Sequence, residues 1–234
     1  MDSQLPRNGQ AIVYIDGFNL YFGLRASTVS QKGYKRLPKK TYWLDLQKLS
    51  EKIVKNNDLI AVKYFTARIK GDPAKQDRQN AFLSAIQLHC PKLRIFEGRY
   101  LLRQMFCRNC RKISSDIICP SCGHVNIFPE EKKSDVNIAT QMLKDAYENN
   151  FDIAYLISGD SDIVPPIQVI RSMVPSKKVA VAFPPHRGGS KELAEAADFS
   201  FHISPSNIKN SLLPDIIPKP DGSELRIPPW WDKQ

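Results

Sequence analysis

The stretch AIVYIDGFN at residues 11–19 and the stretch IAYLISGDSD at residues 153–162 decide the fold of this chain. Each begins with a short, apolar, β-branched run that predicts a buried strand. Each then turns through a glycine that lies next to a carboxylate. A third acidic segment, SDVN at residues 134–137, opens a helical pattern. Ligands of open α/β sheets bind outside the carboxyl ends of the strands, so these carboxylates are expected to converge.

Clustered carboxylates repel one another unless a cation or a proton lies among them, and oxygen-only ligands suit Mg²⁺ or Mn²⁺. The sequence therefore predicts a hard-metal site and an enzyme. The expected ligands are Asp16, Asp135, Asp160 and Asp162. Asn19 is expected to hold a water molecule or a phosphate oxygen. Asp162 is the most ambiguous, because Asp is also a favoured helix N-cap, and the alternative for Asp16 and Asp135 is a turn or cap carboxylate.

Composition favours one substantial domain and a phosphate-rich partner. The chain has 234 residues, of which 42% are hydrophobic, and 34 Lys and Arg against 24 acidic residues give a net charge of +10. Such an excess favours polyanions through counterion release, and the alternative is a generally soluble basic surface. No apolar run approaches the ~20 residues of a membrane span, and the polar start lacks a secretory signal. A cytoplasmic protein is expected.

Strand-like and helix-like segments alternate along the chain, which predicts an α/β fold with a mostly parallel central sheet and helices on both faces. The expected strands cover residues 11–15, 59–69, 93–102, 153–157, 179–183 and 199–203. The expected helices cover residues 18–25, 44–54, 75–88, 134–146, 163–173 and 192–197. Ser134 is the expected N-cap of its helix. The expected core stripe of that helix is Val136, Ala139, Met142, Leu143 and Ala146.

Three parts are expected. Residues 1–102 and 126–204 together form the α/β domain, residues 103–125 form an insert, and residues 205–234 form a Pro-rich tail. The prolines of the tail are expected to break any regular element, while Trp230 and Trp231 suggest that the tail docks on the domain.

The insert contains two C-x₂-C knuckles separated by eight residues. Their cysteines are Cys107, Cys110, Cys119 and Cys122. Four thiolates predict a tetrahedral, structural Zn²⁺ site with no open position, in a compact ribbon. Two tandem pairs disfavour thioredoxin-like redox chemistry, and metal in a reducing compartment is expected rather than disulfides. His124 is expected to be a bystander and Cys90 a buried small hydrophobe.

Basic residues surround the knuckles, and two readings of the ribbon stay open. Arg108, Arg111 and Lys112, with Phe106 beside them for base stacking, favour RNA binding. The alternative is a small hairpin that needs metal to fold. Elsewhere, Arg68 and Lys133 are candidate contacts to the phosphate backbone, and the alternative for both is a solvated charge.

The segments YIDGFNLYFGL, KKSDVNIATQML and YLISGDSDIVPPIQ resemble the motifs of the NYN domain family, in the LabA-like branch of the PIN-like nucleases. The likeness covers residues 11–26, 59–68 and 130–203. It implies a PIN-like fold whose Mg²⁺ or Mn²⁺ site hydrolyses phosphodiester bonds of RNA, with a preference for single strands. Asp16, Asp135 and Asp160 match the acidic ligand positions, Asp162 a further acidic position and Asn19 the polar one. If two metal ions bind, Asp16 is the expected bridging ligand.

Other functions are less consistent with the sequence. Haloacid-dehalogenase-type phosphatases need a second Asp two residues after the nucleophile, and here Phe18 follows Asp16 at that distance. A dinucleotide-binding oxidoreductase needs a G-x-G-x-x-G after the first strand, which is missing. The strongest alternative is an RNA-binding or partner-recruiting module with weak or no catalysis. These motifs set neither the RNA sequence preference nor the oligomeric state.

Overall fold

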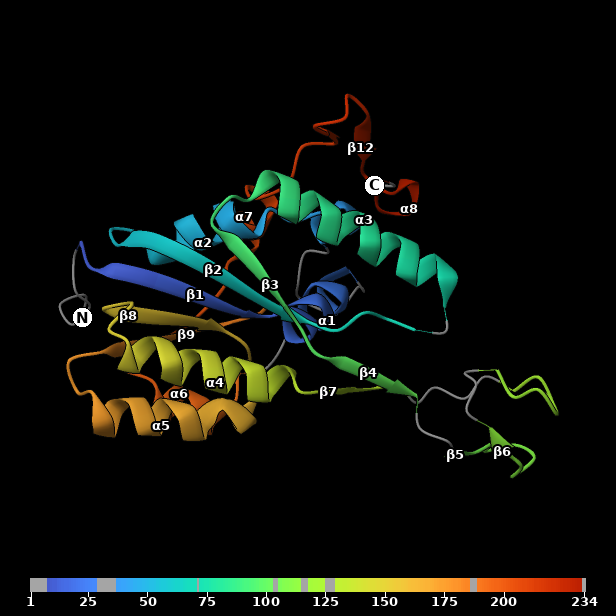
Figure 1. Ribbon diagram of the computed structural model, residues 1–234, viewed down its shortest axis with the longest axis horizontal. Helices are drawn as coiled ribbons and strands as arrows, with labels where there is room; N and C mark the ends of the chain where they lie inside the picture. Colours follow the sequence, from blue (N-terminus) through green and yellow to red (C-terminus); the bar gives the residue numbers. More distant parts are fainter. Residues whose placement is uncertain are drawn as a thin grey trace.

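The computed structural model describes residues 8–28, 37–70, 72–102, 105–114, 118–124, 129–185 and 189–232. The fold is α/β, with a six-stranded parallel sheet in the order β10-β9-β8-β1-β2-β3 and helices against it (Figure 1). The strands of this sheet are β1 (Gln10–Asp16), β2 (Asp58–Thr66), β3 (Leu93–Glu97), β8 (Ile153–Ile157), β9 (Lys178–Phe183) and β10 (Phe199–His202). The parallel sheet predicted from the sequence is confirmed.

Strand β1 lies at the centre of the sheet, between β2 and β8, and is buried from Ala11 to Asp16. Its odd-numbered apolar residues pack into one core cluster and its even-numbered ones into another, so both faces of the sheet are covered. The chain adds β2 and β3 on one side of β1, and β8, β9 and β10 on the other. The carboxyl ends of β1 and β8 therefore form the switch point at which open α/β sheets bind ligands.

Helices cover both faces of the sheet. The first core cluster contains residues of α1 (Gly17–Thr28), α2 (Leu46–Val54) and α3 (Pro73–His89). The second contains residues of α4 (Ser134–Tyr147), α5 (Val164–Met173) and α6 (Lys191–Ala196). Two short 3₁₀ helices, η1 (Lys39–Tyr42) and η2 (Ser161–Ile163), complete the connections. Among the described residues, no helix combines the length and the apolar character that a bilayer span requires.

The strand expected over residues 93–102 is in fact two strands. The Gly98 N–H donates to the Thr66 carbonyl oxygen at 2.7 Å, and the sheet pairing of β3 ends at Glu97. Strand β4 (Arg99–Leu102) then pairs antiparallel with β7 (Pro129–Lys132). In Figure 1 this β4–β7 pair leads away from the sheet toward the cysteine insert, which contains the short strands β5 (Met105–Phe106) and β6 (Ile113–Ser114). Residues 103–104, 115–117 and 125 of the expected insert lie outside the described residues.

Helix α4 differs from its prediction at its start and on its buried face. Ser134 is the first helical residue rather than the N-cap, and Lys133 precedes it with a left-handed φ of 82°. Val136, expected in the core, is 66% exposed, whereas Ile138 is fully buried. The same buried face carries Asp145, so polar contacts to the sheet help to set the rotation of the helix.

The Pro-rich tail is structured and packs on the domain. Its elements are α7 (Pro205–Lys209), β11 (Ile216–Pro218), β12 (Glu224–Arg226) and α8 (Pro229–Asp232). The expectation that prolines break every regular element here is wrong, because Pro205 and Pro229 begin helices, where a missing N–H is tolerated. The expected docking is confirmed for Trp231, whose ring centroid lies 5.8 Å from that of Tyr42 and 6.4 Å from that of Phe82.

Candidate functional site

Asp16 ends β1 at the centre of the sheet and is almost fully buried. Its Oδ1 accepts a hydrogen bond of 2.9 Å from the Asn19 N–H, and its Oδ2 accepts one of 3.0 Å from the Ser158 hydroxyl. Gly17 allows β1 to pass directly into α1, because a Cβ there would lie 2.6 Å from the Phe65 carbonyl oxygen. The turn therefore holds the Asp16 carboxylate in one orientation at the switch point.

The loop after β8 is tied to the same turn. The Gly159 N–H donates to Asn19 Oδ1 at 3.1 Å, and the Asp160 N–H donates to the Ser158 hydroxyl at 3.1 Å. Asn19 thus fastens one strand end to the other through its side-chain oxygen. No role for Ser158 was predicted from the sequence, although its position between a strand and Gly159 could have indicated one. Ser158 is the link between the two acidic turns.

Asp160 and Asp162 have different environments from those expected. Asp160 is the residue that caps η2, since its Oδ1 accepts the Asp162 N–H at 3.1 Å. Asp162 lies in the first turn of η2 and is exposed. The capping role considered for Asp162 therefore falls to Asp160.

Asp135 lies in the first turn of α4 and is only partly exposed. Burial first, and then the negative charges of Asp16, Asp160 and Asp162, raise the pKa of its carboxyl to about 6. Asp135 is thus affected by the other three candidate carboxylates, although the four come from three separate segments. Such mutual repulsion is relieved by a bound cation or by a proton.

The carboxylates are gathered less tightly than the cysteines. Among the described residues, one group of at least three acidic, His or Cys side chains has all its donor atoms within 4.8 Å of one another. That group is the four cysteines. The carboxylate oxygens of Asp16 and Asp160 are instead held by hydrogen bonds within their own turns and, for Asp16, by one from Ser158 of the other turn. The donor set is all oxygen and carries four negative charges, which suits Mg²⁺ or Mn²⁺.

A buried polar network holds α4 against the sheet. Lys63 Nζ of β2 donates to Asp145 Oδ2 at 2.6 Å and to Gln141 Oε1 at 2.9 Å, and the Tyr14 hydroxyl donates to the same carboxylate oxygen. Burial, and then the negative charge of Asp145, raise the pKa of Tyr14 well above its usual value. This network was not predicted from the sequence. The residues that could have indicated it are a lysine within the strand and an aspartate within the helical stripe.

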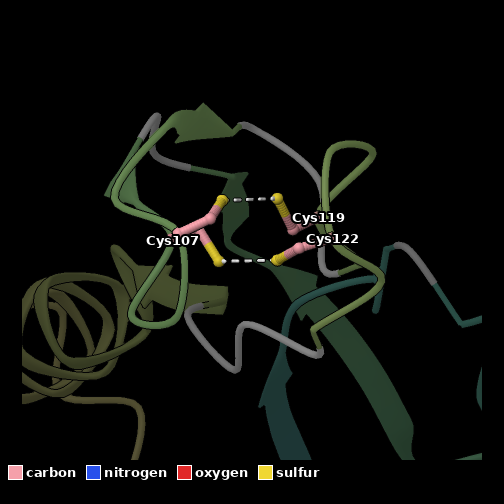
Figure 2. A group of neighbouring side chains, drawn as sticks. Cys107, Cys119 and Cys122 are labelled. Carbon is pink, nitrogen blue, oxygen red and sulfur yellow. Dashed lines mark hydrogen bonds between the residues drawn. The ribbon is translucent and has the colours of Figure 1, made fainter.

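The four cysteines of the insert form a compact ligand set. Figure 2 shows Cys107, Cys119 and Cys122 with their sulfur atoms turned toward a common centre. The Cys107 and Cys122 sulfur atoms lie 3.6 Å apart, and the Cys110 and Cys119 sulfur atoms are also separated by 3.6 Å. A tetrahedral site with Zn–S bonds of ~2.3 Å has a sulfur–sulfur edge of about 3.8 Å. The cluster therefore has the dimensions of a zinc site.

The two knuckles share one backbone geometry. The Arg111 N–H donates to the Cys107 carbonyl oxygen and the Gly123 N–H to the Cys119 carbonyl oxygen, each at 2.8 Å. Arg111 and Gly123 both have left-handed φ values, of 57° and 67°. The backbone N–H of Cys110 lowers the pKa of the Cys107 thiol to about 6, which favours the thiolate that zinc requires.

Cys90 and His124 have the roles that the sequence predicted for them. Cys90 is buried, and burial raises the pKa of its thiol to about 12, so it behaves as the small hydrophobe that was expected. His124 lies outside the four-cysteine ligand group and contributes its carbonyl oxygen to the Cys119 N–H.

The basic residues expected to contact RNA lie in two settings. Arg68 is engaged by Glu97, whose Oε1 lies 2.8 Å from Arg68 Nε and 2.7 Å from Arg68 Nη2. Lys133 is exposed immediately before α4. Arg108, Arg111 and Lys112 are exposed on the insert, beside the 67% exposed Phe106. A contact to RNA stays a prediction for each of them.

A cavity of about 310 Å³, here called the aromatic cavity, opens beside the acidic turn. It lies between α1 and α3, and the tail closes one side of it through Trp231. Gly17 and Phe18, the two residues that follow Asp16, are part of its lining. The cavity and the carboxylates therefore share the turn that ends β1.

A relative and a solved structure give this architecture its context. The chain is 28% identical to a protein named 6-hydroxy-3-succinoylpyridine 3-monooxygenase HspA, from Pseudomonas putida (strain DSM 28022 / S16), over 88% of this chain and 70% of the relative. The crystal structure of a protein of unknown function, VPA0982 from Vibrio parahaemolyticus RIMD 2210633, matches with a TM-score of 0.51 and 20% identity. That match covers 90% of this chain and 99% of the other, and it shows a shared fold.

The family model described as NYN domain matches residues 10–206, from the first residue of β1 into α7. The matched region includes the six strands of the parallel sheet, the four carboxylates of the switch point and the cysteine insert. Assignment to the LabA-like branch stays a prediction. The chain belongs to the NYN domain family.

Proposed function

We propose that this protein is a metal-dependent ribonuclease that hydrolyses phosphodiester bonds of single-stranded RNA. The observation that carries the proposal is that Asp16, Asp160 and Asp162, which come from two other segments of the chain, contribute to the raised pKa of Asp135. Membership of a family with a PIN-like nuclease fold and the net charge of +10 support it.

Each residue of the site has a proposed role. Asp16, Asp135 and Asp160 hold the cation, and Asp162 is a further ligand. When bound, Mg²⁺ or Mn²⁺ supplies Lewis acidity to the scissile phosphate and activates the attacking water. Ser158 and the Asn19 N–H orient the Asp16 carboxylate, and the Asn19 side chain holds the loop after β8. The Zn²⁺ of the insert is structural.

The test is cleavage of labelled single-stranded RNA and DNA in Mn²⁺, in Mg²⁺ and in EDTA. We expect metal-dependent cutting of RNA that falls more than about a hundredfold in Asp16→Asn, because even residues that only support metal ligands cost about 10–100-fold when changed. Asp77→Asn, which removes an exposed carboxylate of α3, is the matched control and should cut normally.

Other outcomes separate the alternatives. Cutting that persists in Asp16→Asn points to a contaminant or to a different site. Tight, salt-sensitive binding without any cutting favours an RNA-binding module instead of an enzyme.

One observation favours a second candidate function. The relative from Pseudomonas putida is named as a monooxygenase of a substituted pyridine, and the aromatic cavity has room for a single aromatic ring. Hydroxylation by O₂ would need two electrons from a separate reductant. Oxygen uptake with NADH and a hydroxylated pyridine carboxylate, coupled to formation of a ring-hydroxylated product, would establish this candidate.

A further inference from the structure

Aromatic rings from α1, β2, α3, the η1 segment and the tail are part of the lining of the aromatic cavity. Tyr21 and Tyr42 have ring centroids 5.4 Å apart, and Tyr42 and Trp231 have centroids 5.8 Å apart. Phe82 meets the Trp231 ring edge-on. Tyr21 is 37% exposed, so an aromatic face is available at the mouth. Such a lining favours a planar ligand that stacks.

Cationic side chains are also part of the lining. They are Arg25, Lys70, Lys75 and Arg78, and Asp72 is the one acidic residue among the lining residues. Lys75 pairs with Asp72 at 2.9 Å. Arg78 also packs on Trp230, which is not among the described lining residues, with its guanidinium 5.1 Å from the ring centre. The ligand that suits this lining is therefore a planar ring attached to an anionic group.

The size of the cavity limits the ligand to one such unit. A volume of about 310 Å³ is at the lower end of the ~300–1,000 Å³ of ligand pockets, too small for a stacked base pair with its two backbones. An RNA base can enter only if it is unpaired and turned out of its stack. Gly17 and Phe18, which directly follow Asp16, line the same cavity, so a base bound there lies next to the turn that ends β1.

We propose that the aromatic cavity binds one unpaired base of the RNA strand next to the bond that is cleaved. This inference rests on the proposed ribonuclease function and specifies its substrate. Stacking on Tyr21 holds the base, and Arg78 attracts the adjoining backbone. The cavity in this way excludes duplexes and sets the position of the cut relative to a single base.

The experiment measures binding of fluorescent single-stranded RNA hexamers in EDTA, so that no cleavage is involved. A series of hexamers carries one abasic site at each successive position. In the wild type, one position should lose at least about fivefold in affinity when its base is removed. In Tyr21→Ala, removal of the base at that position should not lower the affinity further. Tyr147 is an exposed tyrosine of α4, and Tyr147→Ala should keep the wild-type pattern.

Two further variants guard against trivial results. Tyr21→Phe keeps the ring and should restore the wild-type pattern even if Tyr21→Ala is poorly folded by circular dichroism. Arg78→Gln should weaken every hexamer severalfold and flatten the salt dependence, since it removes a charge rather than a stacking face. If removal of the base lowers the affinity by the same factor in the wild type, in Tyr21→Ala and in Tyr21→Phe, the proposal is wrong.

A free aromatic acid is the other source of the same chemistry, and nicotinate tests it. Tight binding of nicotinate that the hexamers cannot displace would overturn the proposal, because the cavity would then serve a small molecule. The outcome for the proposed function is separate. If Asp16-dependent cleavage is seen but the loss on base removal does not depend on Tyr21, this inference alone is overturned. If that loss depends on Tyr21 but no cleavage is seen, the ribonuclease is overturned, and the cavity is left as a base-binding site of an RNA-binding module.

Discussion

At the first turn of α4, burial and then the repulsion of the other candidate carboxylates act on Asp135. Its pKa of about 6 lies above the ordinary value, so the contribution of this group to stability is present below about pH 4 and is lost as the pH rises to about 6. Asp135→Asn should therefore stabilise the protein in EDTA at pH 7.5, by about 1 kcal/mol after allowance for solvent screening, and should abolish metal-dependent cleavage.

Thermal melting between pH 4 and pH 8 checks this prediction. The advantage of Asp135→Asn should grow as the pH rises from about 4 to above 6 and then level off. Asp77→Asn on α3 should show no such trend. An equal effect of the two substitutions at every pH would mean that the pKa of Asp135 is not raised in the folded protein.

Single residues of the site were predictable where the signal was local. Asp16 and Asp160 each follow an apolar run, and strand ends of a parallel sheet meet at one edge whatever the details. The hydrogen bond from Ser158 to Asp16 joins residues 142 positions apart, so no local pattern could reveal it. The cap of η2 is local, and the sequence could not tell which of Asp160 and Asp162 forms it because Asp is a favoured N-cap at either position.

At the scale of one element, α4 depends on its polar contacts to the sheet. Asp145 is buried and balanced by Lys63, so Lys63→Met should leave a buried, unpaired carboxylate. Loss of one partner of such a pair costs about 3–5 kcal/mol. Urea denaturation should show this loss of free energy of unfolding, and Lys63→Met combined with Asp145→Asn should recover much of it.

Lys144→Met is the matched control for that prediction. Its ammonium lies 3.8 Å from a carboxylate oxygen of Glu148 on the surface of the same helix, where an ion pair contributes little. A similar loss in Lys144→Met and Lys63→Met would contradict a special role for the buried pair.

Strands that are buried along their length were predicted well, and strands that pair with a partner distant in the sequence were predicted less well. The strands at residues 153–157 and 179–183 are buried along nearly their whole length, and their apolar runs were sufficient. The break at Gly98 depends on the Thr66 carbonyl oxygen and on the partner strand β7, neither of which is near in sequence. Val136 was assigned to the core because its spacing fits, but Ile138 is the residue that faces the sheet cluster.

At the scale of the whole molecule, the cysteine insert and the sheet should behave as separate units. The insert connects to the domain through the β4–β7 pair, and all four ligands of its candidate zinc site come from the insert itself. Cys122→Ser should therefore remove about one equivalent of bound zinc while the melting of the sheet changes little. Metal analysis and circular dichroism measure the two effects, and Cys90→Ala should keep its zinc.

A large fall in the melting temperature of Cys122→Ser would contradict this separation. It would show that the insert contributes to the stability of the parallel sheet, as the family match across residues 10–206 permits.

The overall architecture was predictable because alternating strands and helices allow few arrangements of a parallel sheet. The tail was less predictable, since its prolines signal irregular structure while Trp231 gains its burial from Tyr42 and Phe82, far earlier in the chain. Contacts between distant aromatic side chains leave no periodic trace in the sequence.

The position of the insert also divides the acidic site between two halves of the chain. Asp16 lies before the insert and the other three carboxylates lie after it, and the halves meet where β1 pairs with β8. A chain cut within the insert would yield two fragments, neither of which carries a complete set of ligands. Reassembly of such fragments should restore the proposed cleavage, so the protein could serve as a split reporter whose signal depends on the association of two proteins fused to its halves.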